Sequence, residues 1–222
     1  MDIIKKLAQE LAIKEEQAKA AVQLIDEGNT IPFIARYRKE MTGALNDETL
    51  RNLHERLLYL RNLEEKKEQV INAITDQGKM TEDLKKKILS AETLVAVDDL
   101  YRPYRPKKQT RATKAKEKGL EPLANILLLQ KTTKSMEEEA AAFVNAEKGV
   151  ANAKEAIAGA KDIIAEMIAD MADYRKSIRN CTMKQGSLVV KAKDEKAESV
   201  YEMYYDFREP LSKVTGYRVL AI

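Results

Sequence analysis

The chain has 222 residues, of which 44% are hydrophobic and 34% are charged, and its formal net charge at pH 7 is +3. Only eight glycines and five prolines interrupt a composition rich in Ala, Glu, Lys and Leu, which predicts an all-α fold in one elongated domain or two small ones. No run approaches the roughly 20 apolar residues of a membrane helix, which excludes a membrane-spanning protein of that kind.

The first forty residues predict three helices. Apolar residues recur at helical spacing from Ile3 to Leu11, and a second helix is expected from about Glu15 to Glu27, ended by Gly28. Thr30 is placed to cap a third helix, IPFIARYRKE, whose second residue Pro32 needs no backbone donor there. This order is the outline of a helix-turn-helix.

The third helix carries a small group of cations, Arg36, Arg38 and Lys39, beside Tyr37. These cations are candidate nucleic-acid contacts. Two packed helices with a solvated basic end explain the same pattern, and we favour that interpretation for a helical pair considered alone.

A long helix is predicted to begin at Asn46 or Asp47 and to end near Asp76, before Gly78. A charged run, Glu64 to Glu68, interrupts its apolar seam. The seam consists of Leu50, Leu53, Leu57, Leu60, Ile71 and Ile74. Thr81 is placed to open another helical stretch.

The excess positive charge gathers in residues 101–119, which we call the basic segment. It holds eight Lys or Arg and one Glu, a net charge of +7, so the remaining residues together carry −4. Because Pro103 and Pro106 exclude a regular helix, we predict an ordered irregular connection between two helical blocks. The candidate nucleic-acid contacts here are Arg102, Arg105, Lys107, Lys108, Arg111 and Lys114.

Two roles for the basic segment have equal weight. Its cations could neutralise phosphates and release counterions, while Tyr101 and Tyr104 stack unpaired bases. Alternatively, the segment is an ion-paired strap that holds the two helical blocks together. Asp98 and Asp99 fit the second role better than a metal site, because two acids without further oxygen ligands bind metal poorly.

The sequence predicts no catalytic centre, metal or cofactor. His54 is the single histidine and Cys181 the single cysteine, so neither a zinc site nor a His-based catalytic triad has its residues at recognisable spacing. We expect His54 to be a packed or half-exposed helix residue. The lone cysteine and the lack of a secretory signal favour the cytoplasm.

In the second half, Glu121 and Pro122 open a helix, and Ser135 with Glu138 forms a capping box. The longest helix is predicted from Ala160 to about Gln185. We expect it to bury one continuous apolar stripe as core. The stripe consists of Ile164, Met167, Ile168, Met171, Tyr174 and Ile178.

The last forty residues change character. SLVVKAK (residues 187–193) is compatible with a strand or a helix, and Glu198 to Phe207 places apolar residues on one helical face. GYRVLAI, ending at Ile222, predicts a short strand. Because a lone strand has nothing to pair with, we expect the sequence to stop where a sheet-containing domain begins.

Several of these stretches resemble the N-terminal region of the Tex family of bacterial transcription accessory proteins. They are Ile31–Asp47, Asp98–Ala124 and Ala160–Asp170, while Phe207–Ile222 resembles the junction before that family's YqgF domain. The resemblance implies a fragment of an elongated helical protein with an early helix-turn-helix and a long central helix. It also implies a role in transcription, nucleic-acid binding mainly through an absent C-terminal RNA-binding domain, and no catalytic residue in this region.

We therefore predict a cytoplasmic helical scaffold of a Tex-like protein that contributes weak, sequence-independent contacts to DNA or RNA. The alternative is a protein-interaction module that docks to the transcription machinery, with nucleic-acid binding left to missing domains. The expected divisions are a helical block over residues 1–100, the basic segment, a second block over 120–210, and the start of a further domain over 211–222.

Overall fold

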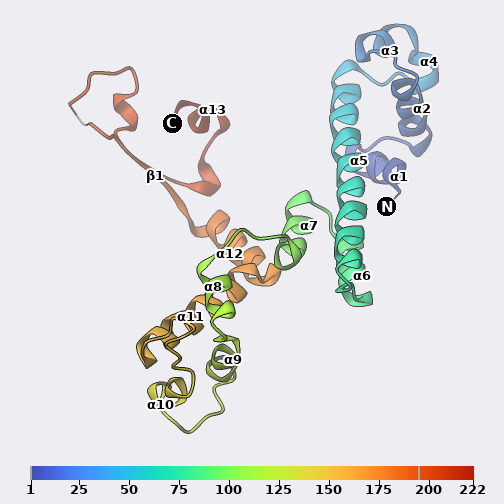
Figure 1. The fold of residues 1–222 in the computed structure, drawn as a ribbon. Helices are drawn as coiled ribbons and strands as arrows, with labels where there is room; N and C mark the ends of the chain where they lie inside the picture. The colour runs from blue at the N-terminus through green and yellow to red at the C-terminus, as the bar shows by residue number, and fades with distance from the viewer. Residues whose placement is uncertain (1, 195) are drawn as a thin grey trace. The chain divides into compact units, whose positions relative to one another are not determined.

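The computed structural model describes residues 2–194 and 196–222 and confirms the all-α fold (Figure 1). The chain forms two compact units, residues 1–101 (unit 1) and 102–222 (unit 2). The finer division predicted above stays a prediction. Within the described residues, no helix is long and apolar enough to cross a membrane.

The regular structure of the described residues of unit 1 is entirely helical. Its helices are α1 (Ile3–Leu11), α2 (Glu15–Asp26), α3 (Ile31–Tyr37), α4 (Lys39–Thr42), α5 (Asp47–Asp76), α6 (Glu82–Ser90) and α7 (Leu94–Tyr101). The helices α5 and α6 start where predicted. The side-chain oxygen of Asn46 accepts the Thr49 N–H, and the hydroxyl oxygen of Thr81 accepts the Leu84 N–H. Thr30 precedes α3 as predicted but makes no side-chain capping bond, and that helix ends at Tyr37 rather than continuing to Glu40.

The long helix α5 organises unit 1, and α1 and α2 lie along it in Figure 1. Its buried seam differs from the prediction in its second half, because Ile71 is only partly buried and the charged run contributes to the seam. The buried residues are Leu50, Leu53, Leu57, Leu60, Leu63, Lys67, Val70 and Ile74. His54 is half-exposed on the same helix, as predicted.

Lys67 continues the seam through the charged run. The residue is 2% exposed, and its Nζ donates to Glu64 Oε1 at 2.8 Å and to the carbonyl oxygen of Leu89 at 2.9 Å. Leu89 lies in the last turn of α6, where carbonyl groups lack helical partners. The aliphatic stem therefore packs as an apolar side chain, while the ammonium ties α5 to the end of α6.

Two bidentate ion pairs join α5 to the first two helices. Arg56 donates to Glu10 of α1 through Nε and Nη2 at 2.6 and 2.8 Å. Arg61 donates to Asp26 of α2 through Nη1 and Nη2, both at 2.7 Å. The hydrogen bonds from the arginines outweigh partial desolvation and hold the pKa of Glu10 and of Asp26 below the ordinary values of 4.5 and 3.8.

These depressed pKa values predict acid sensitivity of unit 1. A carboxylate with a lowered folded-state pKa contributes stability that is present above its unfolded pKa and is lost as the pH falls through the folded value. We expect the two pairs together to lose about 1–2 kcal/mol between pH 5 and pH 2, since exposed bidentate pairs are worth up to about 1 kcal/mol each. Urea unfolding across this range should show a smaller acid loss for Arg56→Gln/Arg61→Gln than for wild type. Equal acid losses would contradict the assignment.

Unit 2 combines helices with one small sheet. Its helices are η1 (Arg102–Tyr104), α8 (Arg111–Glu117), α9 (Glu121–Leu129), α10 (Met136–Ala141), α11 (Ala153–Asp170), α12 (Ala172–Gln185), η2 (Glu202–Tyr204), η3 (Leu211–Lys213) and α13 (Gly216–Ala221). Strands β1 (Ser187–Lys191) and β2 (Asp206–Pro210) pair antiparallel, with Ser187 opposite Pro210 and Lys191 opposite Asp206.

Helix α11 is the centre of unit 2, and α8, α9 and α10 pack on it. The Ser135 capping box at α10 is present as predicted. Gly159 of α11 permits the close packing, because a Cβ built there would lie 2.4 Å from Leu120 Cδ1 and 3.3 Å from the Ala115 Cβ. The buried side chains around it are Ala112, Ala115, Leu120, Leu123, Ala124, Ala140, Val150, Ala156, Ile157, Ala160 and Ile163.

The predicted helix from Ala160 to Gln185 is wrong as a single element. It is broken at Met171, whose ψ of 117° is extended, and α5 is the longest helix in the described chain, with 30 residues. No glycine or proline marks the break. Arg175 donates to the carbonyl oxygen of Ala169 at 3.4 Å, and Asp173 lies in the first turn of α12, where a negative charge is favourable.

The apolar stripe predicted as core is largely exposed. Met167, Ile168, Met171, Tyr174 and Ile178 are between 37% and 66% exposed, and α12 contributes no buried residue. Helical spacing predicts that these side chains share a face, but it does not predict that anything covers the face.

The secondary structure predicted for residues 198–207 and 216–222 is also wrong. Phe207 belongs to β2 and pairs with Val190 of β1, while Gly216–Ala221 is the helix α13 rather than a strand. A helix satisfies its backbone groups within the segment, whereas a strand needs a partner. The C-terminal strand structure expected for the fold is present, at β1 and β2.

Candidate nucleic-acid interface

The basic segment is built from three short pieces. After α7 ends at Tyr101, the chain forms the 3-10 turn η1, then irregular backbone over residues 105–110, and then α8. The prediction of irregular chain throughout is therefore wrong for residues 111–117. Beyond Pro106 no proline opposes a helix, and Thr110 caps α8 by accepting the Thr113 N–H at 3.0 Å.

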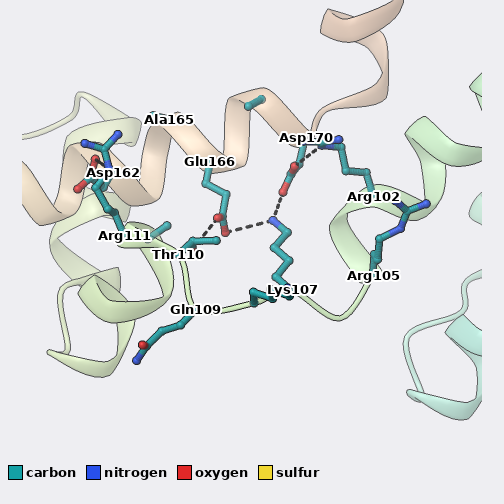
Figure 2. Close-up of a pocket in the computed structure, with 13 residues that line it drawn as sticks. Arg102, Arg105, Lys107, Gln109, Thr110, Arg111, Asp162, Ala165, Glu166 and Asp170 are labelled. Atoms are coloured by element: carbon teal, nitrogen blue, oxygen red, sulfur yellow. Dashed lines mark hydrogen bonds and ion pairs between the residues drawn. The ribbon is translucent and has the colours of Figure 1, made fainter.

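One face of α11 opposes the basic segment with a row of three carboxylates, Asp162, Glu166 and Asp170, which we call the acidic ladder (Figure 2). Their four-residue spacing places them on the same side of the helix. Arg111 Nε lies 3.7 Å from Asp162 Oδ1, at the N-terminal end of the ladder. The groove between the two elements has a volume of about 600 Å³.

Lys107 pairs with two members of the acidic ladder. Its Nζ lies 3.1 Å from Glu166 Oε1 and also donates to Asp170. Partial burial disfavours the charged ammonium, but the two carboxylates outweigh that cost, so the pKa of Lys107 is raised above its ordinary value. Thr110 Oγ1 donates to Glu166 Oε2 at 2.9 Å, and Arg102 Nε donates to Asp170 Oδ1 at 3.0 Å.

The predicted contacts of the basic segment fall into two groups. Arg102 and Lys107 pair with the acidic ladder, whereas the Arg111 side chain lies 3.7 Å from Asp162 but is 87% exposed and belongs to the outward-facing group. Lys108 and Lys114 are exposed, and neither side chain has a hydrogen bond or ion pair within the described residues. Arg105 is an exposed residue that lines the groove and makes an interaction of its own. The structure thus combines an ion-paired strap with an outward-facing set of cations.

The predicted contacts of unit 1 form a separate group. The Arg36 guanidinium lies 5.9 Å from the centre of the Tyr37 ring, and that of Arg38 lies 5.1 Å from the Phe33 ring. Lys39 is exposed at the start of α4. Gly28, with φ of 85°, lies in the turn that joins α2 to α3. That this helical pair acts as a nucleic-acid-binding helix-turn-helix stays a prediction.

Sequence reasoning missed the acidic ladder. The acids at positions 162, 166 and 170 recur at the helical interval within a stretch already predicted to be helical, so the pattern was visible. The pairing expected for Asp98 and Asp99 with Arg102 or Arg105 stays a prediction, although Asp98 lies 3.9 Å from Lys66 and Arg102 pairs with Asp170.

Comparison with protein families gives two matches along the chain. The model described as Tex-like protein N-terminal domain matches residues 1–75, and the model described as Tex central region-like matches residues 131–222. The chain belongs to the Tex family. The resemblance found in the sequence is confirmed.

Several relatives align with nearly the whole chain. Protein YhgF of Escherichia coli is 46% identical over 219 residues, which are 97% of this chain and 28% of YhgF. Transcriptional accessory protein Tex of Neisseria gonorrhoeae is 41% identical over 225 residues, covering 100% of this chain and 29% of that protein. S1 RNA-binding domain-containing protein 1 of Homo sapiens is 30% identical over 231 residues, covering 100% and 23%. The chain therefore spans less than a third of the length of these relatives.

Proposed function

We propose that this chain is a non-catalytic helical scaffold of a Tex-type transcription accessory protein and that it makes weak, sequence-independent contacts to nucleic acid. The observation that carries the proposal is the outward-facing set of cations, Lys108, Arg111 and Lys114. These side chains are exposed and lie within seven residues of one another. Such a set neutralises phosphates without reading bases.

The relatives support the general direction of this proposal. The names of two of them include transcriptional accessory protein and S1 RNA-binding domain, and a bacterial setting agrees with relatives of 41–46% identity from bacteria. The near-neutral net charge of +3 provides little long-range attraction, so the contact is local and weak.

A second function, docking to a protein of the transcription machinery, is favoured by a different observation. The apolar stripe across α11 and α12 is exposed, and contiguous apolar surface frequently marks interaction sites. Under this alternative, the cations of the basic segment are purely structural, and nucleic acid is bound elsewhere in the longer protein.

Binding measured over a salt series tests the first proposal. We expect labelled single- and double-stranded DNA and RNA to bind the chain with similar affinities. If two or three cations reach phosphates, the log–log dependence of affinity on salt should have a slope of roughly −2 to −3 on a duplex. Fluorescence anisotropy between about 50 and 200 mM salt measures it. Absent binding, or affinity that does not change with salt, would contradict the proposal.

A further inference from the structure

The acidic ladder presents anionic oxygens to the same cations that a nucleic-acid strand would need. Asp162, Glu166 and Asp170 form a row along one helix face, with successive members about 6 Å apart along the axis at a rise of about 1.5 Å per residue. A regular row of oxygen anions facing Arg and Lys is also what a phosphate backbone offers.

Two cations of the basic segment contact the acidic ladder directly. Arg102 and Lys107 both hold Asp170, and Lys107 also holds Glu166, whose second oxygen accepts from Thr110 (Figure 2). Each ammonium or guanidinium proton that points to a carboxylate is not available to a phosphate. Nucleic acid must therefore displace the acidic ladder before these protons of Arg102 and Lys107 can bind a phosphate.

We infer that the acidic ladder of α11 is an internal competitor of nucleic-acid phosphates, so that the groove between α11 and the basic segment is an autoinhibitory contact. This inference rests on the proposed nucleic-acid function and adds regulation of the same site. While the ion pairs with the acidic ladder are intact, only the outward-facing cations bind nucleic acid. When the acidic ladder is neutralised, Arg102 and Lys107 become additional phosphate ligands.

Charge neutralisation of the acidic ladder tests the inference on the full chain. The ladder variant is Asp162→Asn/Glu166→Gln/Asp170→Asn, and the control variant is Glu137→Gln/Glu147→Gln/Glu198→Gln, which removes three exposed acids without a hydrogen bond or ion pair in the described residues. Both change the net charge by +3.

We expect the ladder variant to bind a labelled duplex about tenfold more tightly at 100 mM salt. The log–log slope of its affinity against salt should be steeper by about two, since each phosphate contact adds about −0.9. The control should keep the wild-type slope.

Lys107→Ala separates competition from the simple removal of negative charge. If the acidic ladder competes, this substitution changes wild-type affinity little but removes about one unit of slope in the ladder variant. If the acids merely repel nucleic acid, Lys107→Ala has the same effect in both backgrounds. Circular dichroism and thermal unfolding verify folding, and the single variant Glu166→Gln, which keeps an acceptor for Thr110, provides a milder test with a smaller gain.

The outcomes distinguish the inference from the function on which it rests. Tighter binding with a steeper slope in the ladder variant alone supports the inference, even if wild type binds below detection. Salt-dependent binding by wild type without a gain in the ladder variant, or with an equal gain in the control, overturns the inference and leaves the function in place. Absence of binding by both wild type and ladder variant overturns both.

Discussion

Replacing Lys67 by alanine is expected to lower the free energy of unfolding of unit 1 by about 2–4 kcal/mol. The side chain fills the α5 seam between Leu63 and Val70 and is 2% exposed, so truncation creates a cavity as a large-to-small core substitution does. It also removes the donor that satisfies the Leu89 carbonyl oxygen. Urea unfolding followed by circular dichroism measures the loss.

Lys67→Met is the matched control for that prediction. Methionine keeps an unbranched stem of similar length, and replacing a buried ion pair by apolar groups is often neutral or stabilising. Glu64, which loses the hydrogen bond from the ammonium in this variant, is partly exposed and can be hydrated. We expect Lys67→Met to stay within about 1 kcal/mol of wild type. A loss as large as that of the alanine variant would show that the ammonium, not the stem, stabilises this junction.

Gly159→Leu is expected to destabilise unit 2 by about 3 kcal/mol, at the upper end of the range for overpacking a well-packed core. Even a Cβ at this position would lie 2.4 Å from Leu120 Cδ1, and Leu120 is buried and cannot turn into solvent. The leucine side chain must therefore push α8 and Leu120 away from α11. Thermal unfolding measures the stability, and a fall in the pKa of Lys107 would report the displaced basic segment.

Ala158→Leu is the control for the glycine substitution, because it adds a leucine to the exposed side of the same helix. Leucine and alanine are both good helix formers, so its effect on unfolding should stay within about 0.5 kcal/mol. If Gly159→Leu were equally harmless, the close approach between α11 and Leu120 would not control the packing of this unit.

Much of the fold follows from local rules that the sequence displays. Capping residues such as Asn46, Thr81 and Ser135 place helix starts correctly, because the capping bond is made within one turn. The break at Met171 is different, since no local residue type requires it. Asp170, the last residue of α11, accepts hydrogen bonds from Arg102 and Lys107, more than sixty residues earlier in the chain, and periodicity cannot reveal such contacts.

The candidate site was predicted in part for a similar reason. The concentration of cations in residues 101–119 is a property of the sequence alone, and the structure places several of them along one groove. Which cations are ion-paired depends on α11. Only the tertiary structure therefore shows that Lys107 is paired with Glu166 and that Lys108 faces outward. Likewise, the shared face of Tyr174 and Ile178 follows from helical spacing, but its exposure does not.

The most direct test of the central claim is the salt dependence of duplex binding by two triple variants. Lys108→Ala/Arg111→Ala/Lys114→Ala removes the outward-facing cations, and Lys131→Ala/Lys134→Ala/Lys154→Ala removes three other exposed cations of unit 2. Both lower the net charge by three. We predict that the first variant brings the log–log slope close to zero, a loss of roughly two to three units, while the second keeps the wild-type slope. If the first variant binds as wild type does, or if both lose the same slope, the outward-facing cations are not the contact, and docking through the apolar stripe becomes the better account.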